Sequence, residues 1–357
     1  MNRTVIIAEA GVNHNGSLEL AKELVHHAAK AGADFVKFQT FKAELSISTG
    51  TPKAAYQQRT TGAGEDMLAM VRKFELPFEA FEDLARHCAG SGIAFLSTPF
   101  DLPSVDLLDH LGMPLFKIPS GEITNPRLLL AAARTGKPTI MSTGMATLGE
   151  VERALGVLAF GYIGGSDRDA SEQAFANAFT SDPGQAALRS KVSLLHCTTE
   201  YPARLEDVNL RAMATLRAAF DLPVGYSDHS LGLTVPVAAV ALGATVIEKH
   251  FTVDKSLPGP DHQASADPTE LAAMVAAIRE VEAALGQTTK RPSASESAVA
   301  KVARKSLVAA RPIRQGDVLT AEDLAIKRPG TGISPLRLYD LVGSLAKRDY
   351  GRDELID

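Results

Sequence analysis

The chain has 357 residues, of which 45% are hydrophobic and 22% charged, so it is globular and too long for most single domains other than an α/β barrel. A net charge of −5 gives no basic field for binding nucleic acid, and two cysteines, Cys88 and Cys197, are too few for a disulfide framework. The longest apolar stretch, residues 231–247, is shorter than the roughly 20 residues of a membrane span, and we expect a cytoplasmic protein with no membrane partner.

Short apolar runs alternate with longer amphipathic segments along the first 285 residues. The short runs are rich in β-branched residues and predict eight strands: Val5–Ala8, Phe35–Phe38, Ile93–Leu96, Leu115–Ile118, Thr139–Met141, Val192–Leu195, Leu222–Gly225 and Thr245–Ile247. The amphipathic segments predict helices at Leu18–Ala31, Phe78–Ala89, Ser104–Leu111, Arg127–Thr135, Leu148–Leu158, Leu210–Phe220, Thr234–Leu242 and, after the cap Asp267 and Pro268, up to Leu285.

This alternation predicts a parallel sheet, and eight repeats favour a closed TIM (β/α)8 barrel over residues 1–286. An open doubly wound sheet is the alternative, although no GxGxxG motif follows the first strand. Two stretches interrupt the pattern: residues 40–74, which we expect to fold over the barrel mouth, and an insertion at residues 160–191. A Pro/Ser/Thr-rich linker, residues 287–300, precedes a small β-rich domain, residues 301–357, with strands at Ser306–Ala309 and Ala325–Ile326.

Polar residues follow all eight predicted strands, at the end where TIM barrels hold their active sites. Eight convergent polar sets are hard to explain as packing and indicate a pocket for an anionic ligand. Lysine and serine side chains suit a phosphate group. Any single serine could instead be an ordinary helix N-cap without a ligand. Lys37 or Lys117 could instead form a Schiff base, as in aldolases.

Two histidines, His229 and His250, follow the seventh and eighth strands. Paired imidazoles with open positions suit a divalent metal that also binds water and substrate. Glu9, at the end of the first strand, is a candidate general base, and Asp261 can reach the barrel mouth.

Nine motifs in this order resemble the sialic acid synthase family: IIAEAGVNHNG, VKFQTFKA, STPFD, KIPSGEITN, STGMA, LLHCTTEYP, GYSDHS, EKHFT and GPDHQAS. The tail, with ARKSLVA and KRPGTGISP, resembles the antifreeze-like (SAF) domain of that family. The insertion is longer than in many members, and position 199 is Thr where some members carry Asn or Ser.

The resemblance implies a role for each matching residue. Phosphoenolpyruvate would be bound by Lys37, Thr98, Lys117, Ser120, Ser142, Thr199 and Ser227. The cofactor, Mn²⁺ or Mg²⁺, would be bound by His229 and His250, which act in catalysis with Glu9 and Gln39. The N-acyl hexosamine would contact Glu9, Gln39, Tyr201, Asp261 and Arg328, the last from the partner subunit of a domain-swapped homodimer.

The implied activity is that of a transferase which joins phosphoenolpyruvate to an N-acylated mannosamine-type sugar, releasing phosphate and a nine-carbon 2-keto acid. The first expectation is N-acetylneuraminate synthase activity, with N,N'-diacetyllegionaminate synthase activity as the alternative. A pseudaminic acid precursor as the acceptor sugar and a Schiff-base aldolase on the same barrel are more distant alternatives.

Overall fold

The computed structural model describes residues 3–357 and shows two compact units, the first ending at Gly286 and the second beginning at Gln287. Among these residues, no helix is long and apolar enough to cross a lipid bilayer. The first unit holds all eight of the predicted parallel strands, and each begins within two residues of its predicted start.

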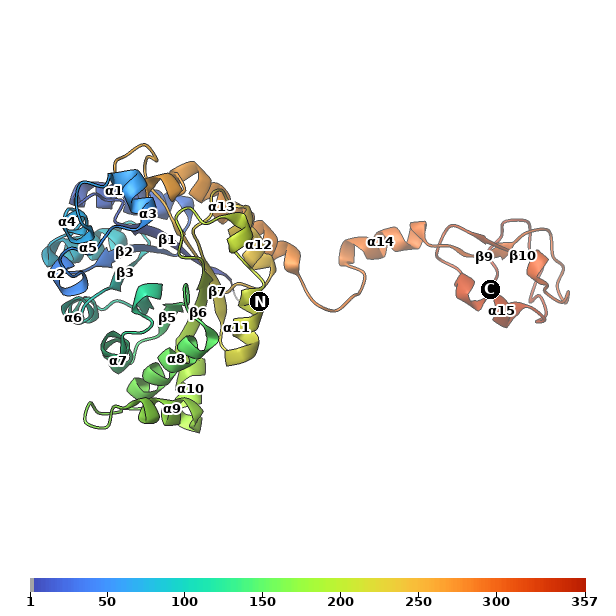
Figure 1. Ribbon diagram of the computed structural model, residues 1–357. Helices are drawn as coiled ribbons and strands as arrows, with labels where there is room; N and C mark the ends of the chain where they lie inside the picture. Colours follow the sequence, from blue (N-terminus) through green and yellow to red (C-terminus); the bar gives the residue numbers. More distant parts are fainter. Residues whose placement is uncertain (1–2) are drawn as a thin grey trace. The chain divides into compact units, whose positions relative to one another are not determined.

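The eight strands form a nearly closed barrel (Figure 1). The hydrogen-bonded ladder runs β3-β2-β1-β8-β7-β6-β5-β4, and its two end strands also contact each other. This confirms the TIM barrel over the open doubly wound sheet. The strands are β1 (Val5–Gly11), β2 (Phe35–Thr40), β3 (Ala94–Pro99), β4 (Phe116–Ile118), β5 (Thr139–Ser142), β6 (Val192–Cys197), β7 (Val224–Asp228) and β8 (Val246–His250).

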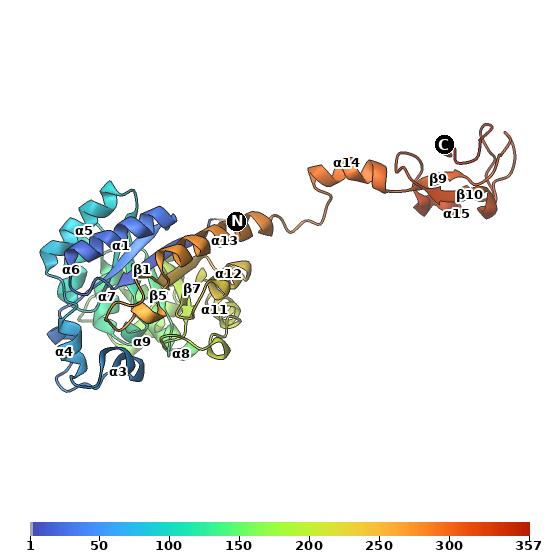
Figure 2. The ribbon, with the colours of Figure 1, turned by 90° about the horizontal axis from the view of Figure 1, so that it is seen from above.

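Helices cover the outside of the barrel, and α1 packs between α13 and α5 (Figure 2). Their starts follow local capping chemistry: Ser17 Oγ accepts from the Leu20 N–H, and Asp267 accepts from the Thr269 and Glu270 N–H groups. The outer helices are α1 (Leu18–Ala31), α5 (Phe78–Gly90), α6 (Leu102–His110), α7 (Pro126–Arg134), α8 (Leu148–Tyr162), α11 (Ala212–Phe220), α12 (Thr234–Ala241) and α13 (Pro268–Leu285); short 3₁₀ turns lie at Ser120–Glu122, Leu205–Asp207 and His262–Ala264.

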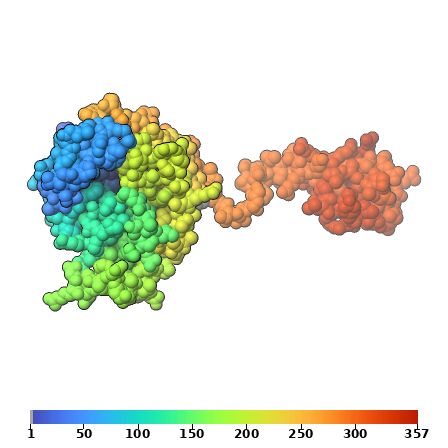
Figure 3. All heavy atoms as spheres, viewed as in Figure 1, coloured from blue at the N-terminus to red at the C-terminus, as the bar shows by residue number. Residues whose placement is uncertain are grey.

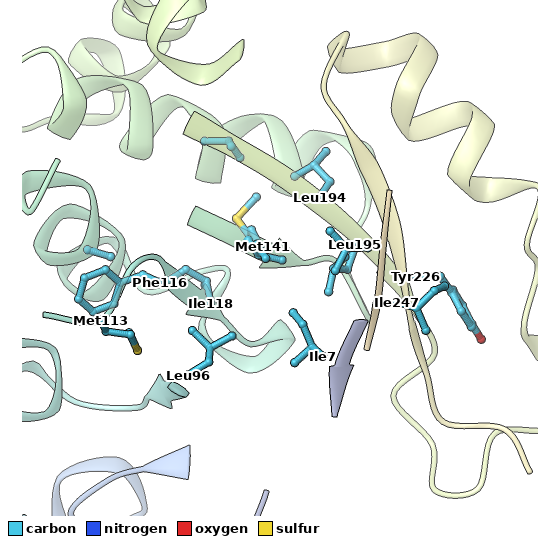
Figure 4. Packing of buried hydrophobic residues seen from close by; sticks show 14 of the residues in the cluster. Ile7, Leu96, Met113, Phe116, Ile118, Met141, Leu194, Leu195, Tyr226 and Ile247 are labelled. Carbon is cyan, nitrogen blue, oxygen red and sulfur yellow. The ribbon is translucent and has the colours of Figure 1, made fainter. Parts of the chain in front are cut away.

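A layer of buried apolar side chains fills the barrel interior (Figure 4). Ile7, Leu96 and Ile118 belong to this layer and come from different strands. Because side chains alternate between the two faces of a strand, the residues two positions further on point the same way. Those residues are polar, so the apolar layer forms the floor of a polar mouth.

The segment between β2 and α5 lies over the mouth, as predicted. It forms three short helices, α2 (Ala43–Ser46), α3 (Ala55–Thr61) and α4 (Met67–Arg72). The ring of Tyr56 lies 5.0 Å from that of Tyr201, and Thr60 Oγ1 donates to Pro260 O at 3.4 Å. These contacts join the segment to the loops after β6 and β8.

The insertion before β6 is mainly helical. Helix α8 extends to Tyr162, four residues beyond its predicted end, so Phe160 is a helical core residue and does not begin the insertion. Helices α9 (Glu172–Thr180) and α10 (Asp182–Lys191) follow, and Phe175 packs edge-on against Phe160 with ring centroids 5.2 Å apart. The aromatic contact explains why α8 continues.

The second unit has its own small core, formed by Leu307, Ile313, Leu319, Tyr350 and Ile356 among others. The two predicted strands are confirmed as an antiparallel pair, β9 (Ser306–Ala309) and β10 (Leu324–Lys327). The remaining elements are α14 (Ala294–Ala303), 3₁₀ turns at Ala321–Asp323 and Pro335–Arg337, and α15 (Leu338–Leu341). Helix α14 occupies much of the predicted linker, because Ser293 and Glu296 form a capping box at its start.

Candidate active site

Four buried charges meet at the carboxyl ends of β1, β2, β4 and β8. Lys37 Nζ lies 2.6 Å from Glu9 Oε2 and 3.6 Å from Glu248 Oε2, and Lys117 Nζ lies 3.2 Å from Glu248 Oε1. All four side chains are at most 6% exposed. This buried charge cluster contains two carboxyl groups and two amino groups, so its charges balance when no ligand is bound.

The cluster shifts the ionisation of its own members. Burial disfavours the charged form of Glu248, yet Lys117 and Lys37 together lower the pKa of this carboxyl. Burial raises the pKa of Glu9 despite the adjacent Lys37. Burial disfavours the charged form of both lysines. At Lys37 the effect of the two carboxylates is larger than that of burial, and the pKa rises. At Lys117 the effect of burial is larger, and the pKa falls. Glu9 is therefore the carboxyl best placed to hold a proton.

Hydroxyl groups surround the charge cluster. Thr98 Oγ1 accepts from Lys37 Nζ at 2.9 Å, and Ser227 Oγ donates to Glu248 Oε1 at 2.9 Å. Ser142 Oγ, on β5, is buried and has no hydrogen-bond partner among the described residues. Hydroxyls and lysines of this kind can bind phosphate or carboxylate oxygens.

A second set of small polar groups lies beside β5 and β6. The Gly144 N–H donates to Ser120 Oγ at 3.0 Å, and Ser120 Oγ lies 3.2 Å from Cys197 Sγ. A Cβ at position 144 would come within 2.8 Å of Ser120 Oγ and would also clash with the Thr199 hydroxyl. Any side chain at position 144 would therefore displace these polar groups.

The two candidate metal-binding histidines are brought together, with ring centroids 5.6 Å apart. His229 Nδ1 lies 2.6 Å from Thr198 O, which places the proton on Nδ1 and leaves Nε2 as a free acceptor. His250 Nδ1 is buried and has no partner among the described residues. Burial lowers the pKa of both imidazoles, so both are neutral and fit a divalent cation.

An ion pair on the outer side of the barrel fixes the strand ends that carry these histidines. Lys249 Nζ lies 2.5 Å from Asp228 Oδ2 and donates to Ser230 O at 2.8 Å. Asp228 in turn accepts from the Ser230 N–H and hydroxyl. Because Lys249 precedes His250 and the other two residues flank His229, this network holds both histidines in place.

A pocket of about 290 Å³ opens beside His250, and Figure 3 shows the hollow between the early and the later parts of the barrel chain. Gln39, Tyr201 and Asp261 line it, and Gln39 Nε2 donates to Glu9 Oε1 at 3.3 Å. Burial, together with the nearby Glu9, raises the pKa of Asp261 to about 7. The pocket therefore combines polar groups with the catalytic candidates.

The structure gathers the predicted site residues of the barrel at one mouth: Glu9, Lys37, Gln39, Thr98, Lys117, Ser120, Ser142, Thr199, Tyr201, Ser227, His229, His250 and Asp261. Arg328 lies in the second unit, where it is exposed and its Nε donates to Ala303 O at 3.0 Å. Its predicted sugar contact stays a prediction.

Three residues of the site were absent from the predicted set: Glu248, Glu122 and Tyr56. Glu248 lies two positions before His250 on β8. Side chains two positions apart on a strand point to the same face, so this spacing could have placed Glu248 on the interior face with His250. Glu122 and Tyr56 line the pocket from a 3₁₀ turn and a short helix, where no strand periodicity marks them.

The fold and the site define a barrel protein whose mouth gathers buried charged and polar side chains. The chain belongs to the NeuB family, whose model matches residues 24–290, and a SAF domain model matches residues 304–357. Both findings confirm the resemblance seen in the sequence motifs.

Two relatives and one solved structure show the extent of the similarity. The chain is 50% identical to N,N'-diacetyllegionaminic acid synthase of Campylobacter jejuni over 356 residues, covering 100% of this chain and 99% of the relative. It is 46% identical to the protein of the same name from Legionella pneumophila, covering 95% and 89%. A crystal structure of N-acetylneuraminic acid synthetase from Leptospira borgpetersenii, in complex with citrate, matches 84% of this chain and 90% of that chain at 34% identity and a TM-score of 0.68. The chain is therefore a transferase-type synthase of this family.

Proposed function

We propose that the chain joins phosphoenolpyruvate to the open-chain aldehyde of an N-acylated mannosamine-type sugar, releasing phosphate and a nine-carbon 2-keto acid. The observation that carries this proposal is the buried charge cluster, with its hydroxyl groups, beside a pair of neutral histidines. The cluster can hold a small, highly charged anion, and the histidine side offers a separate position for an aldehyde oxygen.

Different residues would bind the two substrates. Lys37, Lys117 and the serine hydroxyls would bind phosphoenolpyruvate and orient its C3 toward the sugar, without a covalent bond to the enzyme. Attack of C3 on the aldehyde carbon leaves positive charge at C2, which a water molecule then captures. The C2–O bond of the resulting hemiketal phosphate breaks, which releases phosphate and leaves the 2-keto group. Glu9 lies within the cluster, where its carboxylate can stabilise that charge or accept a proton from the water.

His229 and His250 would bind the divalent cation, Mn²⁺ or Mg²⁺, with the remaining positions left to water and substrate. Among the described residues, no group of three or more His, Cys, Asp or Glu side chains could hold a metal ion, so two protein ligands are the whole set proposed. A bound cation supplies Lewis-acid polarisation of the sugar aldehyde. Removing metal with EDTA should abolish turnover and added Mn²⁺ should restore it, whereas unchanged turnover after stripping would refute the proposal.

For the acceptor, we propose 2,4-diacetamido-2,4,6-trideoxymannose, which makes the product N,N'-diacetyllegionaminate. The names and the 46–50% identity of the two relatives above support this sugar, and they reverse the order expected from the motifs, which put N-acetylneuraminate first. Parallel assays of both sugars with phosphoenolpyruvate test the proposal. A higher kcat/KM for N-acetylmannosamine would overturn it.

One observation favours a second candidate function, a Schiff-base aldolase. Burial lowers the pKa of Lys117, and a neutral amine is what such chemistry needs. The ion pair between Lys117 and Glu248 works against it. Incubation with pyruvate and borohydride distinguishes the two: a trapped lysine adduct would support the aldolase, and an unmodified protein mass would support the synthase.

We also propose a homodimer in which the second unit of each chain contacts the barrel mouth of its partner. Apolar side chains are exposed at the rim of the mouth, where Met145 is 72% and Leu205 69% exposed. The second unit exposes Leu336 at 93% and Tyr339 at 84%. Burying two such surfaces together would stabilise a dimer. Analytical ultracentrifugation should give twice the chain mass, and a monomer at assay concentrations would refute the dimer.

A further inference from the structure

The pocket beside His250 has two chemically different ends. Polar side chains line the end nearest the histidines. The wall formed by the segment over the mouth is apolar, and its lining residues are Phe41, Ile47, Met67, Met70, Val71, Phe74 and, directly after β3, Phe100. These seven residues form the apolar wall of the pocket.

The polar end fixes where the reacting carbon of the acceptor lies, if the proposed function holds. Glu9 Oε1, Gln39 Nε2 and His250 Cε1 all lie within 3.4 Å of one point, the position a Cβ on Gly11 would take. Because Gly11 has no side chain, the space beside these three groups stays free, and the sugar aldehyde belongs there, next to the metal-binding candidates and the carboxylate. The opposite end of the sugar chain then extends toward the apolar wall.

The apolar wall forms a cluster of its own, separate from the barrel core. The rings of Phe41 and Phe100 pack edge-on with centroids 6.2 Å apart, and Met67 and Val71 are partly buried against the cluster. These side chains offer carbon and sulfur surface and no strong hydrogen-bond donor.

Two polar residues at the edge of the wall each make one hydrogen bond within the protein. Ser46 Oγ donates to Phe100 O at 3.2 Å, and Gln57 Oε1 accepts from the Ala54 N–H at 2.9 Å. Glu122, further along the pocket, accepts from Asn125 Nδ2 at 2.6 Å. A sugar hydroxyl placed directly against the seven apolar side chains would lose hydrogen bonds to water, because none of these side chains is a strong donor or acceptor.

We infer that the apolar wall selects the acceptor by its far end, favouring a C6 methyl and an acetamido methyl at C4 over hydroxyl groups. This inference rests on the proposed function and identifies the residues that choose between two sugars. Burying an unpaired hydroxyl costs about 1–3 kcal/mol. Each hydroxyl of N-acetylmannosamine placed against the wall should thus lower its kcat/KM by about 5- to 150-fold relative to the deoxy sugar.

Replacing Met67 with glutamine tests the inference, because Met67→Gln keeps the length of the side chain and adds a donor and an acceptor. The ratio of kcat/KM for the trideoxy sugar to that for N-acetylmannosamine should fall at least about tenfold. The KM for phosphoenolpyruvate should not change. Leu45→Gln is the matched control, since Leu45 lies in α2 of the same segment, is 61% exposed and does not line the pocket; it should keep the wild-type ratio.

The outcomes separate the two proposals. If the wild type prefers the trideoxy sugar but Met67→Gln keeps the wild-type ratio, the inference is wrong and the proposed function stands. If the wild type prefers N-acetylmannosamine or uses neither sugar, the proposed acceptor is wrong and the inference falls with it. Should circular dichroism show that Met67→Gln is unfolded, the isosteric Val71→Thr variant carries the same test with the same expected fall in the ratio.

Discussion

Replacing Glu248 with glutamine would remove one carboxylate from the buried charge cluster while keeping its shape. Lys37 and Lys117 would then share Glu9 alone, and Lys117 would lose its ion-pair partner. Breaking a buried ion pair from one side costs about 3–5 kcal/mol. Since Lys117 can release its proton when its partner is lost, the lower part of this range applies near neutral pH.

The loss should appear as a lower thermal midpoint in differential scanning calorimetry. At about 2 °C per kcal/mol for a unit of this size, a loss of about 3–4 kcal/mol should make Glu248→Gln melt about 6–8 °C below the wild type. Phosphoenolpyruvate brings its own negative charge to the two lysines. The ligand should therefore raise the melting temperature of the variant by more than it raises that of the wild type.

A matched control is Glu282→Gln. Glu282 pairs with Arg279 near the amino-terminal end of β1, away from the mouth, and is 20% exposed. This variant should lose some stability but show the wild-type rise in melting temperature with phosphoenolpyruvate. The reasoning would be refuted if Glu248→Gln melted within about 2 °C of the wild type, or if the ligand stabilised Glu248→Gln and the wild type equally.

Three further predictions concern single side chains. His229→Ala or His250→Ala should weaken Mn²⁺ binding at least about 100-fold in titration calorimetry and remove most turnover; wild-type metal content in either variant would contradict the metal assignment. Arg328→Ala should raise the KM for the sugar about tenfold and leave the KM for phosphoenolpyruvate alone, and an equal rise in both would count against a sugar contact. His14 has a pKa lowered to about 4 by burial and by His262. Between pH 6.5 and about 4, His14 therefore binds a proton in the unfolded chain but stays neutral in the folded state. The free energy of unfolding falls as the pH drops through this window, by about 2 kcal/mol at pH 5. Urea unfolding measures the free energy of unfolding at pH 7 and at pH 5. The difference between these two values should be about 2 kcal/mol smaller for His14→Gln than for the wild type.

Much of the barrel could be read from local patterns. The eight strands, the cap of α1 at Ser17 and the start of α13 at Pro268 each depend on neighbouring residues, and each lies close to its predicted place. The end of α8 was less predictable, because it depends on Phe175, fifteen residues further along the chain, packing against Phe160. Helix α14 was missed because it directly follows a Pro-, Ser- and Thr-containing stretch that resembles a linker, although Ser293 and Glu296 offered a capping signal.

The sequence by itself determined which residues reach the mouth, because polar residues follow each apolar run and strand periodicity is local. Only the tertiary structure decided which of them touch. Barrel closure makes β1 the neighbour of both β2 and β8, so Glu9 lies level with Lys37 and with His250, a residue 241 positions away. The same closure places Glu248 between two lysines from distant strands. Ion pairing depends on distance in space, and strand alternation fixes the face of each side chain but not its partner.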